Sequence, residues 1–170
     1  MRLWLVRHGA TDWSAAGRLC GSSDVPLSTE GRAQADPIRR RLAGHSFDGV
    51  WTSDLARARE FARLAVGQAT PDPRLRELDF GELEGKRWKD IDASNRRALV
   101  RFEGFVAPGG ESVVQLEERV GGFLAELEPG DHLLMTHGGV IRLLARRRGV
   151  AFAPLPGEMT VLEWERVEAK

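Results

Sequence analysis

Short apolar runs, separated by longer mixed segments, form the basic pattern of this chain. The first run, at about 3–6, is apolar at successive positions, which is typical of a β-strand covered on both faces. Three later runs predict further strands, at about 49–52, 133–135 and 161–164, the last of them at an edge of the sheet. Strands of this kind, with helices between them, predict an α/β fold.

Helices are predicted in the segments between these strands. Ser28 is a suitable N-cap for a helix that runs towards Gly44, and Pro37 predicts a kink or a break within it. Other helices are expected after Ser53-Asp54 through Ala65, from 111–112 to about 127, and over 140–148. Alternating strands and helices are typical of a layered sheet with short crossovers.

The pattern weakens between residues 71 and 108. Residues 75–81 are expected to form a loop or a short strand, and residues 88–105 to form short helices. We interpret the region around 82–110 as a cap-like insertion over the sheet. At 170 residues, the chain (1–170) is most simply one domain, which buries roughly two-thirds of the surface that it exposes when unfolded.

Composition and charge narrow the range of partners. Lys and Arg together number 25, as do Asp and Glu, so no net charge favours nucleic acid or a membrane surface. Cys20 is the only cysteine, which excludes an intramolecular disulfide framework. Charged residues interrupt the early apolar run, and no run reaches the roughly 20 apolar residues of a membrane span. We therefore expect a cytoplasmic protein without nucleic-acid or membrane partners.

Two of the apolar runs end in a histidine followed by glycine. Arg7-His8-Gly9 follows the first predicted strand, and Thr136-His137-Gly138-Gly139 follows the strand at 133–135. In an open α/β sheet, ligands bind at the carboxyl edge of the strands, where both segments are expected. Imidazoles beside an arginine, and beside glycine amides at a helix N-terminus, predict a site for an anion such as a phosphoryl group.

Phosphoryl transfer without a metal needs a nucleophile, fixed positive charge and an acid. His8 can attack phosphorus, and flanking arginines favour its neutral imidazole. Arg57 is expected in the first turn of a helix at a strand's carboxyl end, and its planar fork suits phosphoryl oxygens. Glu77 is the candidate acid, because it lies in a segment that could cross the same edge of the sheet. Alternatively, Glu77 forms an ion pair with Arg74 or Arg76. The acid would then be one of the neighbouring carboxylates Asp79, Glu82 and Glu84.

Six stretches of the chain, in order, resemble the histidine phosphatase superfamily, the phosphoglycerate-mutase-like proteins: LVRHGAT at 5–11, GSSDVPLSTEGRAQA at 21–35, TSDLARA at 52–58, LRELDFGELEG at 75–85, PGGES at 108–112 and THGGVIR at 136–142. The resemblance implies a three-layer α/β/α sandwich with a mostly parallel central sheet and a short helical cap. Within the family, small α-ribazole phosphatases and broad sugar-phosphate phosphatases are the most similar in pattern.

The resemblance also implies roles for individual residues. His8 would be phosphorylated, and Glu77 would donate a proton to the leaving oxygen. The phosphoryl group would be bound by Arg7, Arg57 and His137. Additional substrate-binding positions would be Thr11, Ser14, Cys20, Gly21 and Gly138. The chain departs from the family's usual residues at Ala10, Ser14 and Phe61-Ala62.

We therefore predict a phosphatase that needs neither metal nor other cofactor and acts on a small phosphorylated metabolite, such as α-ribazole 5′-phosphate or a sugar phosphate. Near His8, Asp12 and Asp24 are too few to hold a metal. A phosphoglycerate mutase and a noncatalytic phospho-ligand binding module stay open, as does assembly into a homo-oligomer. Only about thirty residues separate Gly81 from Glu111, and a short cap favours hydrolysis because it seals the site poorly against water.

Overall fold

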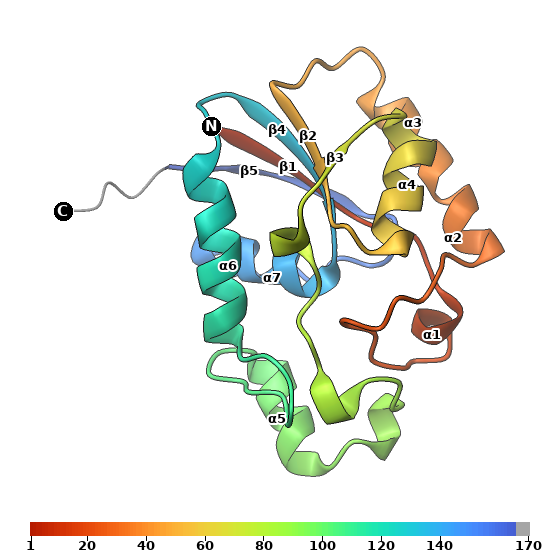
Figure 1. Cartoon of the computed structure of the whole chain (residues 1–170), viewed down its shortest axis with the longest axis vertical. Coiled ribbons are helices and arrows are strands. Elements are labelled where there is room, and N and C mark those ends of the chain that lie inside the picture. Colours follow the sequence, from red (N-terminus) through yellow and green to blue (C-terminus); the bar gives the residue numbers. More distant parts are fainter. Residues whose placement is uncertain (166–170) are drawn as a thin grey trace.

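The computed structural model describes residues 1–165, and within them one sheet of five strands (Figure 1). The strand order is β3-β2-β4-β1-β5; the first four are mutually parallel, and β5 is antiparallel to β1. The strands are β1 (Arg2–Arg7), β2 (Gly49–Thr52), β3 (Thr70–Pro71), β4 (Asp131–Thr136) and β5 (Met159–Glu163). The predicted mostly parallel sheet is confirmed.

Helices cover both faces of this sheet. On one face lie α2 (Thr29–Ala33), α3 (Ala35–Leu42) and α4 (Ala56–Val66), and on the other lie α6 (Val113–Glu126) and α7 (Gly138–Arg147) (Figure 1). Sheet and helices thus form three layers, so the α/β/α sandwich predicted from the sequence is confirmed.

The central strands supply apolar side chains to both helical layers. Leu5 and Leu134 belong to the core beneath α6 and α7, whereas Val6, Leu133 and Met135 belong to the core beneath α3 and α4. Successive side chains of a strand point to opposite faces, so a strand covered on both faces has to be apolar at consecutive positions. This requirement explains the uninterrupted apolar runs in the sequence.

Short helices follow one another in the middle of the chain. They are the 3₁₀ helices η1 (Pro73–Leu75), η2 (Gly81–Leu83) and η3 (Trp88–Asp90), and the α-helix α5 (Ala93–Arg101). The part from η2 to α5 lies beyond the carboxyl ends of the parallel strands, at the bottom of Figure 1. Leu99 of α5, together with Phe102 and Phe105 just after it, joins the core beneath α6 and α7. Helices η3 and α5 confirm the short helices expected at 88–105.

The element bounds differ from the expected ones in a few places. The helix predicted from Ser28 is broken at Gln34 into α2 and α3, and Pro37 lies in the first turn of α3, where a missing N–H costs little. The four-residue helix α1 (Asp12–Ala15) and the two-residue strand β3 were not expected. Both are too short to leave a periodic pattern in the sequence.

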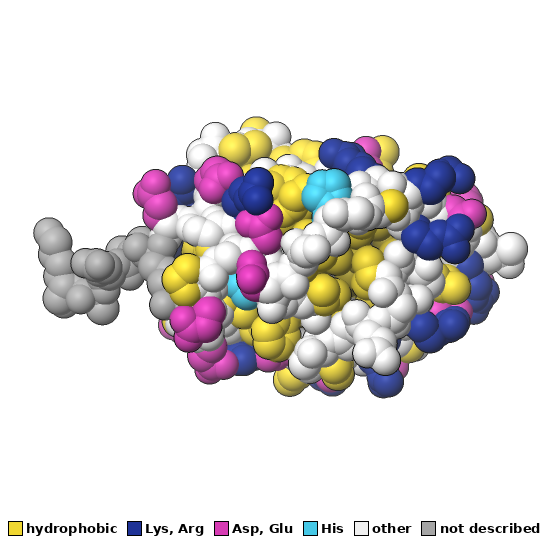
Figure 2. All heavy atoms as spheres, turned by 90° about the horizontal axis from the view of Figure 1, so that it is seen from above, with side chains coloured by type: hydrophobic (Ala, Val, Ile, Leu, Met, Phe, Trp, Pro, Cys, Tyr) yellow, Lys and Arg dark blue, Asp and Glu magenta, His cyan; other side chains and the backbone are white. Residues whose placement is uncertain are grey.

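Positive and negative side chains gather on different sides of one end of the molecule (Figure 2), although the chain has no net charge. Figure 2 shows the end of the molecule at the top of Figure 1, where Lys and Arg gather on the side of α3 and α4, and Asp and Glu on the opposite side. Helix α3 contributes three exposed arginines, Arg39, Arg40 and Arg41. Among residues 1–165, no helix has the length and apolar character needed to cross a bilayer.

Candidate active site

The two histidine–glycine segments meet at the carboxyl edge of the sheet. Arg7 at the end of β1 is aligned with Thr136 at the end of β4, so the residues that follow them are neighbours. The backbone N–H of His8 donates to the carbonyl of Thr136 at 3.1 Å, and the rings of His8 and His137 have centroids 5.0 Å apart in an edge-to-face arrangement. The structure thus brings together the histidines expected at this edge.

Two hydrogen bonds define the form of the His8 imidazole. Its Nδ1 lies 2.7 Å from the carbonyl oxygen of Gly9, which can only accept, so Nδ1 carries the proton. The guanidinium of Arg57 donates from Nε to the other ring nitrogen, Nε2, at 3.3 Å. The lone pair therefore sits on Nε2 and faces a cation. Burial, followed by the charges of Arg57 and Arg7, lowers the pKa of His8 to about 3, so the ring is neutral at pH 7.

Arg57 lies in the first turn of α4, as predicted, and is completely buried. Its Nη1 donates to the carbonyl of Ser23 at 2.8 Å, and its Nη2 donates to the carbonyl of Gly21 at 2.6 Å. These bonds fix the guanidinium beside His8 and also hold the loop over the site. Because burial in a low-dielectric interior strengthens electrostatic interactions, this cation can act strongly on a bound anion.

Three further buried nitrogen atoms lie in the same region. Arg7 is anchored through Nη1 to the carbonyl of Pro154 at 2.7 Å. Among the described residues, however, Nε of Arg7 and both ring nitrogens of His137 have no hydrogen-bond partner. Buried polar atoms are normally paired, so these atoms are available to a ligand. Burial, and then the neighbouring His8 and the two arginines, lowers the pKa of His137.

Glu77 is held at the same site by backbone amides. Its carboxylate accepts hydrogen bonds from the N–H of Gly139, at 3.1 Å to Oε1 and 3.0 Å to Oε2, and from the N–H of Leu78 at 2.9 Å. A Cβ at Gly139 would come within 2.2 Å of Oε1, so only glycine permits this approach. Burial lowers the pKa of Arg7 and the Glu77 carboxylate opposes this shift, which indicates that the two charges are close.

The alternative partners of Glu77 are engaged elsewhere. Arg74 pairs with Asp72 and Glu126, and Arg76 pairs with Asp54. Two of the rival acids also have other contacts. Asp79 accepts from the hydroxyl of Ser22 and the N–H of Gly81, and Glu84 accepts from the backbone amides of Gly21, Ser22, Ser23 and Phe80. Glu84 therefore holds the loop that Arg57 binds from the other side, a function that the sequence did not indicate.

The additional predicted positions lie in two environments. Gly21 belongs to the loop held by Arg57 and Glu84, and an added Cβ there would lie 2.0 Å from the carbonyl oxygen of Leu78. Gly138 lies against the Arg7 guanidinium, 3.4 Å from the place of its Cβ. The hydroxyls of Thr11 and Ser14 bond to each other's backbone in a capping box at α1. Their part in binding a substrate stays a prediction.

Cys20 has a protonated thiol at neutral pH. Burial, only partly opposed by Arg57, raises its pKa to about 11. Its Sγ lies 3.8 Å from the carbonyl of Ser23. A thiol needs to be ionised to act as a nucleophile, so the electrostatics favour His8 over Cys20 in that role. Within residues 1–165, no group of three or more His, Cys, Asp or Glu side chains is arranged to hold a metal ion.

A family model and individual known proteins both match this chain. The model of the histidine phosphatase superfamily (branch 1) matches residues 3–155. A Salmonella choleraesuis protein named "Probable phosphoglycerate mutase GpmB" is 39% identical over 152 residues, which cover 81% of this chain and 70% of that protein. The adenosylcobalamin/alpha-ribazole phosphatase of Escherichia coli K12 is 35% identical over 159 residues, which cover 86% of this chain and 78% of that protein.

A similar structure is also known. The crystal structure of phosphoglycerate mutase from Thermus thermophilus has a TM-score of 0.91 and 44% sequence identity to this chain, and the match covers 98% of this chain and 95% of that one. Sequence and structure therefore point to the same relatives, which carry both phosphatase and mutase names. On these grounds, the chain belongs to the histidine phosphatase superfamily.

Proposed function

We propose that this protein hydrolyses small phosphomonoesters without a metal, through a phosphohistidine at His8. The observation that carries the proposal is the state of His8: a neutral imidazole with its lone pair on Nε2, facing the Arg57 guanidinium at 3.3 Å. A neutral nitrogen can attack phosphorus, and the adjacent cation attracts the phosphoryl oxygens to it.

The first step forms a bond between His8 Nε2 and phosphorus and breaks the bond between phosphorus and the leaving oxygen. The Arg57 N–H that donates to Nε2 in the free protein becomes available to a phosphoryl oxygen. Arg7 contributes its unpartnered Nε–H, and His137 donates from the one ring nitrogen that carries its proton. The phosphomonoester binds as its monoanion, and the Glu77 carboxylate takes up the proton of this monoanion and passes it to the leaving oxygen, which departs as a neutral alcohol.

The second step transfers the phosphoryl group to water. The Glu77 carboxylate takes a proton from the water as its oxygen attacks phosphorus, and the bond to Nε2 breaks. Glu77 gives this proton to the inorganic phosphate, which leaves as the monoanion, and both His8 and Glu77 thereby return to their initial protonation states. The same carboxylate thus serves first as an acid and then as a base, and its bonds to Gly139 and Leu78 hold it at one place for both steps.

The short cap favours hydrolysis over mutase activity. Between β3 and α6, the described chain has only three 3₁₀ helices and the single α-helix α5. A mutase has to keep water away from its phosphohistidine until the substrate is phosphorylated again, which requires a well-sealed site. The relatives carry mutase as well as phosphatase names, so the preference for hydrolysis rests on the short cap. For the substrate we propose α-ribazole 5′-phosphate or a sugar phosphate, in the cytoplasm.

Phosphate release in EDTA tests this proposal. The panel contains α-ribazole 5′-phosphate, sugar phosphates and 3-phosphoglycerate, and each substrate is given to the wild type and to His8→Ala. We expect release by the wild type and a loss of at least about a thousandfold in His8→Ala. Release that requires added metal, or that persists in His8→Ala, would contradict the proposal. Conversion of 3-phosphoglycerate to 2-phosphoglycerate without phosphate release would identify a mutase, and binding without turnover a noncatalytic module.

Trapping the phosphorylated protein tests the intermediate itself. Incubation with a ³²P-labelled substrate should label the wild type but not His8→Ala. A phosphorus–nitrogen bond is stable in alkali and is hydrolysed in acid, whereas a phosphoserine shows the reverse stability. Label that survives acid, or label on His8→Ala, would place the intermediate on another residue.

A further inference from the structure

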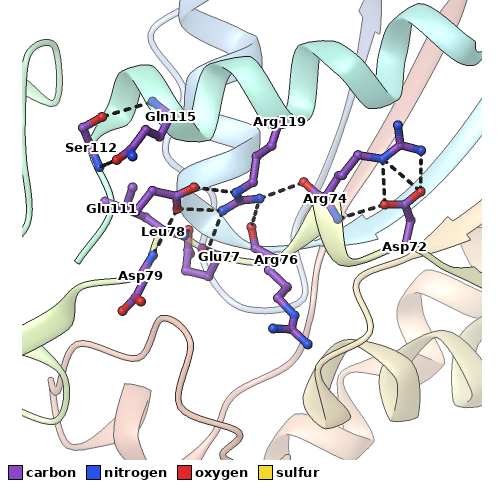
Figure 3. A network of polar contacts seen from close by, with 10 residues as sticks. All are labelled: Asp72, Arg74, Arg76, Glu77, Leu78, Asp79, Glu111, Ser112, Gln115 and Arg119. Carbon is purple, nitrogen blue, oxygen red and sulfur yellow. Dashed lines mark hydrogen bonds and ion pairs between the residues drawn. The ribbon is translucent and has the colours of Figure 1, made fainter. Parts of the chain in front are cut away.

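Arg119 of helix α6 binds the segment that carries Glu77 (Figure 3). Its Nε and Nη2 form a two-pronged ion pair with Glu111, at 2.6 and 2.9 Å. Its Nη1 donates to the carbonyls of Arg74 and Arg76, at 2.7 and 2.8 Å, and Nη2 also donates to the carbonyl of Glu77 at 3.0 Å. A guanidinium has five N–H donors, and all five are used here.

Glu111 holds the same segment on the other side of Glu77. Its Oε2 accepts from the backbone N–H of Asp79 at 3.2 Å, and its own N–H donates to the carbonyl of Asp79 at 2.9 Å. The backbone is therefore fixed both before and after Glu77, by two side chains that are themselves paired. We call this pair, Arg119 and Glu111, the bracket.

The bracket replaces the bonds that regular secondary structure would supply. Helix η1 ends at Leu75, and the chain from there to η2 has neither helix nor strand. Backbone carbonyls in such a segment need partners when they are shielded from water. The bracket itself is partly buried, with side-chain exposures of 22% for Arg119 and 15% for Glu111. A guanidinium anchored on a 14-residue helix thus provides a rigid reference for an irregular segment.

We propose that Arg119 is a positioning residue that, together with Glu111, sets the carboxylate of Glu77 at the distance that proton transfer to the leaving oxygen requires. Arg119 binds the backbone carbonyl of Glu77, and the side-chain carboxylate of Glu77 binds the N–H of Gly139. Hydrogen bonds therefore fix both the backbone and the side-chain end of Glu77. Displacement of a reacting group by about 1 Å can cost on the order of a hundredfold in rate. This inference rests on the proposed role of Glu77 as the acid.

The test compares two arginines that bind the same segment. Arg119→Gln removes the bonds to the Glu77 carbonyl and to Glu111. Arg74→Gln is the matched control, because Arg74 also links the segment to α6, through Glu126, but its side chain makes no bond to Glu77. Each variant is assayed with an alkyl phosphate, whose leaving group needs a proton, and with p-nitrophenyl phosphate, whose leaving group needs little protonation. The rate measured is the release of alcohol or p-nitrophenol in the first turnover, because the later attack of water, in which Glu77 acts as base, is the same for both substrates.

We expect Arg119→Gln to lower the first-turnover rate for the alkyl phosphate by about 10- to 100-fold, with the half-saturating substrate concentration and the aryl phosphate rate changed less than about threefold. Arg119→Lys, which keeps the charge and some of the donors, should recover part of the loss. Arg74→Gln should behave as the wild type does with both substrates. Equal slowing of the two substrates by Arg119→Gln, or equal effects of Arg119→Gln and Arg74→Gln, would overturn the inference.

A double-mutant cycle separates this inference from the proposed function. If Arg119 acts through Glu77, adding Arg119→Gln to Glu77→Gln causes no further loss with the alkyl phosphate. A full additional loss would overturn the inference. If Glu77→Gln alone slows both substrates equally, the role of Glu77 as acid fails. If Glu77→Gln slows only the alkyl phosphate and Arg119→Gln does not slow the alkyl phosphate, then only the positioning role of Arg119 fails. Should Arg119→Gln not fold, Glu111→Gln tests the same bracket.

Discussion

At the scale of single residues, the site is organised before a ligand arrives. The two terminal nitrogens of Arg57 and the carboxylate of Glu84 bind the backbone of one loop, and Glu77 accepts from two amides. The atoms left for a phosphoryl group are Nε2 of His8 and the unpartnered nitrogens of Arg7 and His137. Preorganised donors of this kind stabilise charge without the cost of rearranging during the reaction.

Gly139 offers a direct test at this scale. In Gly139→Ala, the new methyl group would lie 2.2 Å from Oε1 of Glu77, so the carboxylate has to move. We expect the first-turnover rate for an alkyl phosphate to fall by about tenfold or more, with a smaller change for p-nitrophenyl phosphate. Single-turnover kinetics with the two substrates measure the difference.

Gly138→Ala is the control for this variant. Its methyl group would meet the Arg7 guanidinium at 3.4 Å, which is an ordinary van der Waals distance. The selective loss with alkyl phosphates should therefore be absent from Gly138→Ala. If Gly139→Ala treats both substrates as the wild type does, the contact between Gly139 and Glu77 has no part in catalysis.

At the scale of elements, the sequence was most informative where one strand determines both packing and chemistry. The apolar runs of β1 and β4 predicted buried parallel strands, and parallel neighbours have to present His8 and His137 at one edge. The bracket could not be found in this way. Arg119 contacts residues more than 40 positions away along the chain, in a segment without a periodic pattern.

Helix α6, which carries Arg119, is weakened by an exposed Gly121-Gly122 pair in its interior. A Cβ at Gly122 would meet no heavy atom within 4 Å. Glycine in a helix interior is less stable than alanine by about 0.5–1 kcal/mol, mainly because of its backbone entropy. We therefore expect Gly122→Ala to raise the free energy of unfolding by about that amount, as measured by urea denaturation.

Gly67, at the C-terminal end of α4, is the matched control. It also has open space around its Cβ position, but its φ is +84°, which L-residues adopt at a cost. Gly67→Ala should therefore lower the free energy of unfolding by about 1 kcal/mol. If both substitutions shift stability in the same direction, backbone conformation does not explain the difference between the two glycines.

At the scale of the whole molecule, the two helical layers and the sheet bury the histidines of the site, and this burial has a thermodynamic consequence. His8 and His137 are 5% and 0% exposed, and the positive charges of Arg7 and Arg57 lie close to both. The folded protein therefore resists protonation of the two rings, whereas the unfolded chain binds protons with the ordinary histidine pKa of about 6.5. The architecture that provides a neutral nucleophile also links stability to pH.

The sign of this linkage follows from the depressed pKa of His8. Between the unfolded value of about 6.5 and the folded value of about 3, the unfolded chain holds a proton that the folded protein lacks. The free energy of unfolding should therefore decrease as the pH falls through this range. His8 contributes a slope of up to about 1.4 kcal/mol per pH unit, and the lowered pKa of His137 acts in the same direction.

Urea denaturation of the wild type and of His8→Asn, at intervals from pH 7 to pH 4.5, isolates the contribution of His8. Carboxylates paired with arginine also lose stabilising charge in acid, but they are present in both proteins. The difference between the two curves therefore reports on the imidazole. As the pH falls, we expect the free energy of unfolding of His8→Asn to decrease less steeply than that of the wild type, by up to about 1.4 kcal/mol per pH unit. Parallel curves would mean that His8 takes up a proton as readily in the folded protein as in the unfolded chain, and the neutral nucleophile of the proposed mechanism would then lose its electrostatic basis.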